Sequence, residues 1–462
     1  MTWSPGALRA DAPLYLALAD RIAQDVAGGR LAPGERLPTH RELAAALDVD
    51  VTTVTRGYAE ARRRGLLTGR VGRGTFVSAG PGTGDGVGSR GSSGVADLSL
   101  NVPPTLDPDL PAQAFARTLA AAAKDVHLGA LLAYHDNAGM QAHRAAGAAW
   151  IRRRIPGVEP ERVVVTNGAQ HAILVLLSTL ASRGDVVLTE GLTYPGFKDA
   201  AEHLGLRVRG LDMDDDGITV ESFRRACRAG ATVLYTTPTI QNPTTITTSA
   251  GRRAALAKVA RQHGARIIED DVYGVLAGRA PAPLSMHAPE LSYFVASLTK
   301  AVAGGLRIGY VACPTAADAE RIAAGVRVST WMAAPLMAHV ASDWVRSGVA
   351  RDILKANRAE AARRQAAASR VLRGSTWRAD RFGYHGWLEL PDDWSSGEFV
   401  AQARRRGVAL TPADAFAAEG RAERAAVRLC LTGTGDVETL ERALGTVAGL
   451  LELGPRAASR HM

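Results

Sequence analysis

The chain has 462 residues, 46% of them hydrophobic and 22% charged, with a formal net charge of +9 at pH 7. This length predicts two or three domains, and the composition is that of a soluble globular protein with ample core. The apolar run HAILVLLSTLA is too short to span a bilayer, and the N-terminal stretch MTWSPGALRADAPLY lacks the pattern of a signal peptide.

The three cysteines, Cys227, Cys313 and Cys430, lie far apart and show no metal-binding or redox spacing. We therefore expect reduced thiols, a cytoplasmic protein and no bound metal. The net positive charge permits a polyanionic partner, and its distribution along the chain is more informative than its sum.

A glycine-rich stretch divides the chain into two regions. Residues 80–94, GPGTGDGVGSRGSSG, contain seven glycines in fifteen positions and no apolar periodicity. Such a segment behaves as a flexible linker with a span of about 20–25 Å. We predict a head at residues 1–78, a linker at 79–97 and a body at 98–452.

The head carries the signals of two short helices joined by a turn, after a first helix in APLYLALADRIAQDVAGG. Thr39 and Glu42 form a capping box directly after Pro38, so a helix should begin there and end near Leu47. Asp50 can cap the next helix, from residue 51 to about 64. The pattern predicts a helix-turn-helix, whose second helix can enter a major groove.

The segment LLTGRVGRGTFV then alternates as a small hairpin would, and residues 51–78 contain six arginines against one acid. Short polar side chains (Thr52, Thr53 and Thr55) stand at the exposed start of the second helix, where base edges and phosphates would be met. A helical docking module with a basic solvated face is the alternative. The ordered combination of caps, basic helix and basic hairpin favours DNA binding.

Residues 12–78 also resemble the winged helix-turn-helix of GntR-family bacterial regulators, through GRLAPGERLPTHRELA, TTVTRGYAEARRRGLL and GRGTFV. The resemblance implies double-stranded operator DNA as a partner. The DNA contacts that it implies fall on Arg41, Thr52, Thr53, Thr55, Arg56, Gly72 and Arg73.

The body alternates apolar strand patterns with helical ones. The strand patterns are RVVVTNG, DVVLTEG, ATVLYTTP, RIIEDD, YFVASL and RIGYVAC. Continuous apolar strands between helices predict an α/β fold with a mainly parallel sheet that is buried on both faces. In such sheets ligands bind beyond the carboxyl ends of the strands.

Polar clusters follow several of these strands. TNGAQ (166–170) can hold a phosphate at a helix N-terminus through Gly168, Ala169 and Gln170, although such a turn is more often only a turn. TYPG offers Tyr194 and TIQNPTT offers Asn242, and each alone is also typical of a plain loop. IIEDDVYG ends a buried strand in three acids, which is costly without a cationic partner.

A single lysine in SLTKAVAGGLR, Lys300, explains these clusters together. Lysine forms a Schiff base with the aldehyde of pyridoxal 5'-phosphate, and an aspartate then keeps the ring nitrogen protonated. Ser297 and Arg307 suit the phosphate, Tyr194 can stack on the ring, and Asn242 and Tyr273 can donate to the ring hydroxyl oxygen. The alternative is an ordinary lysine at a strand end.

Residues from about 98 to 452 resemble fold-type I aminotransferases through TNGAQ, TYPG, QNPT, EDDVY, SLTK and GLR. The resemblance implies that Lys300 holds the cofactor and that Asp270, from the family spacing D-x-x-Y, contacts the pyridine nitrogen. It also implies that Arg428 binds a ligand carboxylate and that Tyr134 reaches the phosphate of a neighbouring subunit. A smaller domain is expected at about 345–452.

A GntR-like head joined to such a body is similar to the MocR-type regulators. This resemblance implies a homodimeric transcription factor that senses pyridoxal phosphate, an amine or an amino acid. The alternative is a working aminotransferase with a fused DNA-binding head, since Lys300 and Arg428 are both present. A scaffold without a cofactor would require every polar strand end to be a coincidence.

Overall fold

The protein forms two compact units, residues 1–93 and 94–462, in a computed structural model. The described parts are residues 3–5, 13–27, 30–31, 35–63, 66–70, 74–77, 95–106, 109–124 and 128–460. The glycine-rich stretch at 80–94 therefore lies outside the described residues.

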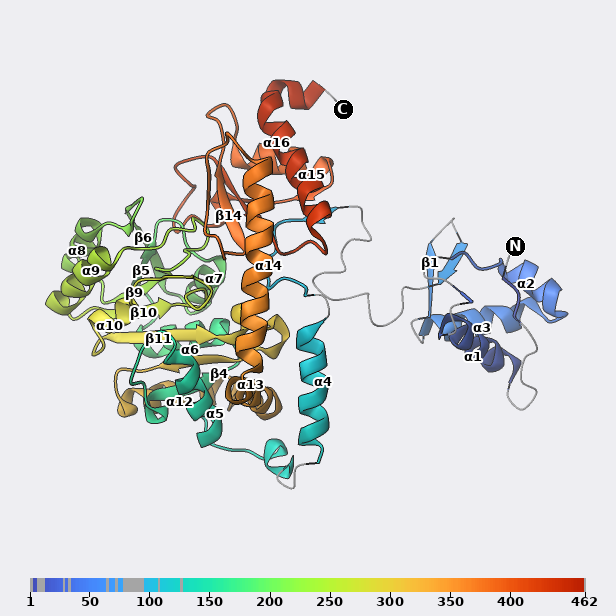
Figure 1. Cartoon of the computed structure of the whole chain (residues 1–462), viewed down its shortest axis with the longest axis horizontal. Helices are drawn as coiled ribbons and strands as arrows, with labels where there is room; N and C mark the ends of the chain where they lie inside the picture. Colours follow the sequence, from blue (N-terminus) through green and yellow to red (C-terminus); the bar gives the residue numbers. More distant parts are fainter. Residues whose placement is uncertain are drawn as a thin grey trace. The chain divides into compact units, whose positions relative to one another are not determined.

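The first unit is a set of short helices with a hairpin. Its elements are α1 (Leu14–Ala27), α2 (His40–Leu47), α3 (Val51–Arg63), β1 (Leu67–Arg70) and β2 (Gly74–Val77). The two strands pair antiparallel, and α1 and α2 both pack on α3 (Figure 1). Leu18, Leu43 and Tyr58 lie in its buried core. These elements confirm the predicted winged helix-turn-helix.

The helix starts of this unit follow the predicted caps. The Thr39 hydroxyl accepts from the Glu42 N–H at 3.3 Å, and the Glu42 carboxylate accepts from the Thr39 N–H at 2.8 Å. Asp50 accepts from the N–H of Thr52 at 2.7 Å. Each cap satisfies an N–H group that has no partner inside its helix, which fixes where α2 and α3 begin.

The second unit is built on a large sheet. The described strands run in the order β4–β12–β11–β10–β9–β5–β6. Their bounds are β4 (Val163–Thr166), β5 (Val186–Glu190), β6 (Arg207–Leu211), β9 (Val233–Thr236), β10 (Arg266–Asp270), β11 (Ser292–Ser297) and β12 (Gly309–Ala312). Neighbouring strands pair parallel except at β12, which is antiparallel to β11 and β4. The prediction of a mainly parallel sheet is confirmed.

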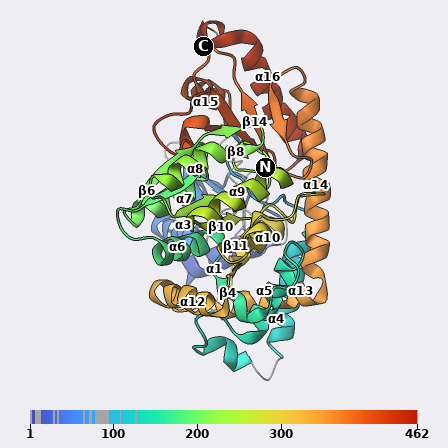
Figure 2. The ribbon, with the colours of Figure 1, turned by 90° about the vertical axis from the view of Figure 1, so that its left-hand side faces the viewer.

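Helices cover both faces of this sheet, as Figures 1 and 2 show. Along β10, Ile267 packs with residues of α8 and α9 on one face, and Ile268 packs with residues of α6 and α7 on the other. Successive strand side chains point to opposite faces, so a sheet covered twice needs continuous apolar strands. The helices of this larger part are α4 (Leu110–Ala122), α5 (Gln141–Ile151), α6 (Ala169–Leu180), α7 (Pro195–His203), α8 (Val220–Arg228), α9 (Ala250–His263), α10 (Leu284–His287), α11 (Leu298–Ala301), α12 (Ala316–Thr330) and α13 (Pro335–Ser347).

The C-terminal part forms a smaller sheet with the strand order β13–β14–β17–β16. Its elements are α14 (Val349–Val371), β13 (Trp377–Ala379), β14 (His385–Glu389), α15 (Ser396–Arg405), β15 (Val408–Ala409), β16 (Thr411–Pro412), β17 (Ala426–Cys430) and α16 (Val437–Arg460), with non-helical backbone at Gly454. The long helix α14 packs on α16 in this part and on α11 and α13 in the larger one (Figure 1).

The strands β6 and β3 are among those that have no counterpart in the sequence analysis. The edge strand β6 begins RVR and exposes both arginines, so it lacks the continuous apolar run of the inner strands. The short strand β3 (Ala96–Asp97) pairs with β15, although these two residues had been assigned to the linker. Leu98, which follows β3, is fully buried in the core of the C-terminal part. The first residues of the second unit therefore pack with its C-terminal part.

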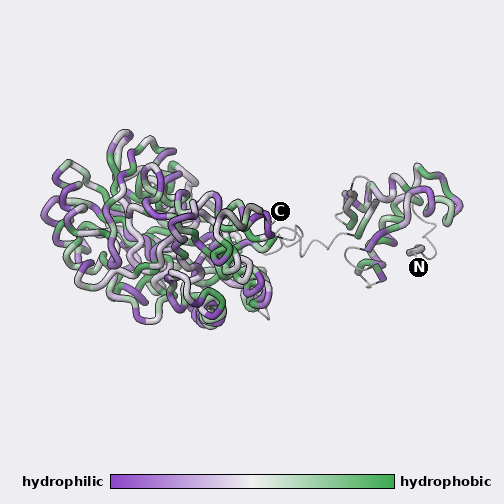
Figure 3. Tube along the Cα trace, turned by 90° about the horizontal axis from the view of Figure 1, so that it is seen from above, coloured by the Kyte–Doolittle hydropathy of each residue, from purple (hydrophilic) through white to green (hydrophobic). Residues whose placement is uncertain are grey.

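A short hairpin, β7 (Met213–Asp214) with β8 (Gly217–Ile218), completes the regular strands of the described residues. None of the helices in the described ranges is both long and apolar enough to cross a membrane. Figure 3 shows hydrophilic and hydrophobic residues intermixed along the helices, as expected for helices with one buried and one exposed face.

Candidate functional site

A cavity of about 260 Å³ lies at the carboxyl ends of the central strands of the large sheet. Its wall contains residues from the ends of β9, β10 and β11 and from the starts of α6 and α7. Most of the predicted cofactor residues meet there: Ala169, Gln170, Tyr194, Asn242, Asp270, Tyr273, Ser297, Lys300, Arg307 and Arg428. Among these predicted residues, Ala169 and Arg428 share one wall although they are 259 positions apart in sequence.

Lys300 lies in α11, directly after β11, and its side chain lines this cavity. The Nζ group donates to the backbone carbonyl of Asn101. Burial, together with the charges of Arg428 and Arg307, lowers the pKa of Lys300 from its ordinary 10.5 to about 8. A larger fraction of neutral amine near neutral pH makes this lysine a better nucleophile than an exposed one.

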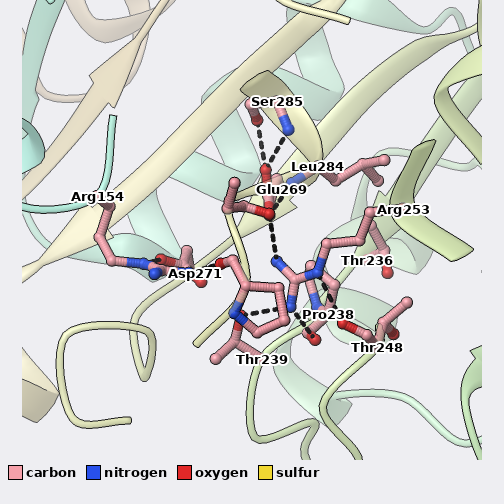
Figure 4. A network of polar contacts seen from close by, with 12 residues as sticks. Arg154, Thr236, Pro238, Thr239, Thr248, Arg253, Glu269, Asp271, Leu284 and Ser285 are labelled. Atoms are coloured by element: carbon pink, nitrogen blue, oxygen red, sulfur yellow. Dashed lines mark hydrogen bonds and ion pairs between the residues drawn. The ribbon is translucent and has the colours of Figure 1, made fainter. Parts of the chain in front are cut away.

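The three adjacent acids at the end of β10 have different partners. Glu269 accepts from Ser285 and from the N–H of Leu284, and it lies 3.6 Å from a guanidinium nitrogen of the buried Arg253 (Figure 4). Asp271 pairs with Arg154 at 2.7 Å. Two of the three acids therefore have the cationic partner that a buried carboxylate requires.

Asp270, between them, accepts from the hydroxyl of Tyr235 at 2.8 Å through Oδ2. Its Oδ1 atom is buried and has no hydrogen-bond partner, and no ion pair to it occurs among the described residues. Burial raises the pKa of Asp270 to about 6. A buried acceptor that faces a cavity beside a lysine fits a cationic ring N–H, because such a donor would satisfy Oδ1 and favour the ionised carboxylate.

At another side of the cavity, Arg307 lies against Gly168. Gly168 caps α6 with φ +84°, and a Cβ atom added there would lie 2.8 Å from Arg307 Nη2. The first N–H groups of α6, at Ala169 and Gln170, have no partner within the helix. Glycine, guanidinium and helix start together form a cradle for a phosphate group. The Ser297 hydroxyl lines the cavity too, and it already donates to the Ile308 carbonyl at 2.9 Å.

Arg428, from β17, enters the cavity from the C-terminal part. Its Nη1 donates to Asn242 Oδ1 at 2.9 Å and its Nη2 donates to the Ser99 carbonyl at 2.7 Å, while Nε is buried and has no hydrogen-bond partner among the described residues. The guanidinium also stacks on the ring of Phe416, 4.8 Å from its centroid. Since Nε and Nη2 form one edge of the guanidinium, this edge can bind a carboxylate.

The two tyrosines of the cavity are both shielded from water. Burial raises the pKa of Tyr273 and of Tyr194, so both hydroxyls stay protonated at neutral pH. Tyr273 accepts from Asn101 Nδ2 at 2.9 Å, which leaves its own O–H free to donate. The ring of Tyr194 lines the cavity at the start of α7.

Tyr134 does not reach the cavity of its own chain. Its side chain is 81% exposed, and its ring meets that of Trp331 edge-on, with 5.7 Å between centroids. Its predicted contact with the phosphate of a neighbouring subunit stays a prediction.

Seven further cavity residues are absent from the sequence analysis, and three of them, Ser99, Leu100 and Asn101, are consecutive and follow β3. Ser99 contacts Arg428, and Asn101 contacts Lys300 and Tyr273. Tyr235, the donor to Asp270, was also missed. The segment LSLNVPP has no periodicity or motif that could have indicated these contacts, and Tyr235 looks like an ordinary core residue of a buried strand.

The predicted DNA contacts lie on the first unit. Arg41, on α2, is exposed, as are Thr52, Thr55 and Arg56 on α3, and Thr53 is half-buried. Arg56 lies over the ring of Tyr15 in α1, with its guanidinium carbon 4.1 Å from the ring centroid. Arg56 therefore packs on Tyr15, a contact that the sequence analysis did not predict. Gly72 and Arg73 lie outside the described residues.

Two family descriptions match this chain. Residues 93–447 match "Aminotransferase class I and II", and residues 14–77 match "Bacterial regulatory proteins, gntR family". Similar solved structures include the kynurenine aminotransferase of Pyrococcus horikoshii, with a TM-score of 0.72 and 22% identity over 80% of this chain and 92% of that one. This likeness confirms the aminotransferase fold of the second unit.

Relatives that match about two thirds or more of this chain are named as regulators of transcription or catabolism. The uncharacterized HTH-type transcriptional regulator YdeF of Bacillus subtilis (strain 168) is 30% identical over 98% of this chain and 97% of its own length. The probable rhizopine catabolism regulatory protein MocR of Rhizobium meliloti is 28% identical, over 64% of this chain and 66% of its own. The vitamin B6 salvage pathway transcriptional repressor PtsJ of Salmonella typhimurium (strain LT2) is 29% identical, over 65% and 68%.

Proposed function

The chain belongs to the transcriptional regulators that join a GntR-family region to an aminotransferase class I and II region, and we propose that it binds pyridoxal 5'-phosphate around Lys300 and DNA through its first unit. The observation that carries the cofactor half of this proposal is the set of partners of three adjacent acids. Glu269 and Asp271 each pair with an arginine, although Asp271 Oδ1 also lacks a hydrogen-bond partner. Asp270 has no ion pair among the described residues, and it lines the cavity that holds Lys300.

The residues of this cavity suit each end of the cofactor. Pyridoxal phosphate, when bound, supplies an aldehyde that bonds covalently to a lysine amine and a ring that withdraws electrons. Lys300 provides the amine, and Asp270 Oδ1 accepts from the protonated ring nitrogen. Arg307, Gly168 and the first N–H groups of α6 hold the phosphate, together with Ser297.

The remaining cavity residues fix the ring. Tyr273 donates its hydroxyl proton to the ring hydroxyl oxygen, while Asn101 holds that hydroxyl in place. Asn242 donates to the same oxygen through Nδ2, since its Oδ1 already accepts from Arg428. Tyr194 covers one face of the ring.

A carboxylate-bearing amine is the second ligand that the cavity favours. Arg428 lines the same space, and its Nε has no partner within the described residues. The name of MocR refers to rhizopine catabolism, and that of PtsJ refers to the vitamin B6 salvage pathway. The effector of this chain is therefore the cofactor alone or the cofactor with an amino acid.

The protein acts as a homodimer, with Tyr134 of each subunit next to the phosphate of the other. A dimer presents two helix-turn-helix units to two half-sites, which multiplies their affinity for an operator. A regulator of this kind works beside the chromosome, so we place it in the cytoplasm.

Selection of binding sites from a random double-stranded DNA library tests the proposal. The full chain, incubated with pyridoxal phosphate, should enrich a pair of half-sites, and removal of the cofactor by dialysis against a carbonyl-trapping amine should change the affinity for that DNA. Absence of any enriched sequence contradicts the DNA half of the proposal. An affinity that is independent of the cofactor contradicts the sensing half.

The working aminotransferase remains the second candidate, because Lys300 and Arg428 line one cavity. An aminotransferase must convert an amino acid to a keto acid repeatedly, whereas a sensor does not need this reaction.

A further inference from the structure

The hydroxyl of Tyr235 hydrogen-bonds one of the two carboxylate oxygens of Asp270. It donates to Oδ2 at 2.8 Å, and both residues are buried. The other oxygen, Oδ1, has no hydrogen-bond partner among the described residues. Tyr235 thus occupies one oxygen of Asp270 and leaves the other for a ligand of the cavity, which Asp270 lines.

Three features fix the position of the Tyr235 hydroxyl. Tyr235 lies in β9, where it is opposite Ile268 in the parallel pairing with β10. Its ring stacks on that of Phe197 in α7, with 4.1 Å between the centroids and 5° between the planes. The whole tyrosine side chain is buried. A close-packed ring has little freedom to move, so the carboxylate takes its orientation from the hydroxyl.

The Tyr235 hydroxyl remains a proton donor at neutral pH. Burial and the charge of Asp270 raise the pKa of Tyr235 well above its ordinary 10, so the hydroxyl keeps its proton. A donor favours the charged form of the carboxylate that accepts from it. Burial raises the pKa of Asp270 to about 6, and the hydrogen bond from Tyr235 opposes this rise.

Several other groups act on the charge of Asp270. Among the described residues they are the carboxyl groups of Asp271 and Glu190, the N–H of Val272, the amine of Lys300 and the hydroxyl of Tyr194. The two carboxyl groups raise the pKa of Asp270 further, whereas the Val272 N–H lowers it less than Tyr235 does. Tyr235 is therefore the main group that keeps this buried carboxyl ionised.

We propose that Tyr235 is a positioning residue, which orients Asp270 and keeps it charged, so that bound pyridoxal phosphate carries its ring proton on nitrogen. This inference rests on the proposed function, because it takes Asp270 as the partner of the ring nitrogen. A protonated ring withdraws electrons more strongly than a neutral one. Tyr235 thereby raises the reactivity of the cofactor carbon that bonds to Lys300, although it does not line the cavity itself.

The first test uses the full chain without cofactor. Tyr235→Phe removes the hydroxyl and keeps the ring that stacks on Phe197. Tyr310→Phe is the matched control, since Tyr310 is a fully buried tyrosine of β12 whose hydroxyl has no hydrogen-bond partner among the described residues. Each substitution is also made in an Asp270→Asn background, which lacks the carboxylate on which Tyr235 acts.

The pKa of Asp270 is higher in the folded chain than its ordinary 3.8, so stability falls as pH rises between these two values. Loss of a hydrogen bond to a charged group corresponds to about a tenfold change in an equilibrium constant. From about pH 4 to about pH 8, the unfolding equilibrium constant of Tyr235→Phe should therefore rise about tenfold more than that of the wild type. Tyr310→Phe should follow the wild type, and Tyr235→Phe should add no pH dependence to Asp270→Asn.

The second test loads the same proteins with pyridoxal phosphate that carries nitrogen-15 in its ring, and records the chemical shift of this nitrogen by solid-state NMR. The wild type and Tyr310→Phe should show a protonated ring nitrogen, and Tyr235→Phe should move the shift toward that of a neutral pyridine. An unchanged shift in Tyr235→Phe, or a pH profile equal to that of Tyr310→Phe, overturns the proposal. Failure of the wild type to bind the cofactor contradicts the proposed function instead.

If Tyr235→Phe does not fold, 3-fluorotyrosine in place of Tyr235 decides the question. Its hydroxyl is more acidic and is therefore a stronger donor, so the pKa of Asp270 in the folded chain should fall. The loss of stability with rising pH should then end at a lower pH than in the wild type. The same replacement at Tyr310 should leave the profile unchanged, and equal profiles for the two positions overturn the proposal.

Discussion

The guanidinium of Arg307 lies so close to Gly168 that a Cβ atom added at Gly168 would be 2.8 Å from Nη2. Gly168 also has φ +84°, a conformation that side chains other than glycine rarely adopt. Two separate constraints thus require glycine at the start of α6. Only one of them, the approach of Arg307, concerns the phosphate cradle.

Gly168→Ala should weaken the binding of pyridoxal phosphate by about tenfold or more, because it pushes Arg307 away from the cradle. The backbone strain should also lower the free energy of unfolding by roughly 1 kcal/mol. Gly157→Ala separates the two effects, since Gly157 has φ +75° but open space around it. Equal cofactor affinities of the two variants, measured by absorbance titration, would argue against the cradle.

Asp270 should destabilise the cofactor-free protein above pH 6. Burial raises its pKa from the ordinary 3.8 to about 6, so the folded chain keeps a proton that the unfolded chain releases between these pH values. The unfolding free energy therefore falls as pH rises through this window. Asp270→Asn should raise it by about 1–3 kcal/mol at pH 7.5 and have little effect near pH 4.

Asp271→Asn is the control for this pair, because it removes the partner of Arg154 instead of an unpaired charge. We expect it to destabilise the protein at pH 7.5 in denaturant unfolding. Asp270→Asn should nevertheless bind pyridoxal phosphate more weakly than the wild type. A stabilised variant with wild-type cofactor affinity would refute the assignment of Asp270 to the ring nitrogen.

Lys300→Ala should abolish covalent attachment of the cofactor. Borohydride reduction followed by peptide mapping should place the label on Lys300 in the wild type and leave Lys300→Ala unlabelled. Lys198→Ala, which removes a partly buried lysine that donates to Ala417, should label normally. Because the pKa of Lys300 is lowered to about 8, the rate of attachment should rise with pH and level off above 8. A label on another lysine would show that the assignment is wrong.

Arg56→Ala should reduce the affinity for DNA and lower the salt-dependence slope by about one. It should also cost the first unit roughly 0.5–1 kcal/mol, because the guanidinium lies on the Tyr15 ring. Arg56→Lys keeps the charge but loses the planar stack on Tyr15. Its salt-dependence slope should therefore be close to that of the wild type, while the first unit should remain less stable than in the wild type. Arg73→Ala should change the slope in the same direction. Wild-type slopes in both alanine variants would remove these residues from the DNA interface.

The sequence was sufficient to predict which residues at strand ends gather around one cavity. Lys300, Asp270 and Arg307 stand beside apolar strands, where polar residues of these types are conspicuous. The choice of Asp270 over Asp271 came from a family spacing. The structure supplies a physical reason for this choice, since Arg154 pairs with Asp271, whereas Asp270 has no ion pair among the described residues.

Contacts between distant segments were beyond the sequence. Asn101 meets Lys300 across 199 positions, and Ser99 meets Arg428 across 329. Both use backbone carbonyls, which every residue has, so no residue type could indicate them. The strand β3 was missed because its pairing with β15 also uses backbone groups, which no residue type indicates. In an edge strand such as β6, buried and exposed residues alternate, so the strand lacks a continuous apolar run. Two exposed arginines make the hydrophobic pattern of β6 weaker still.

The measurement that tests the central claim most directly is a visible-absorbance titration of the pyridoxal phosphate-loaded chain with a panel of amino acids and amines, with the affinity for selected DNA recorded in parallel. If the second unit is a sensor, at least one of these ligands should change the affinity for DNA. The cofactor absorbance should then shift or stay unchanged, and no keto acid should be released continuously. Complete conversion of the cofactor to its aminated form with steady keto-acid production, at constant DNA affinity, would contradict this account and favour a working aminotransferase.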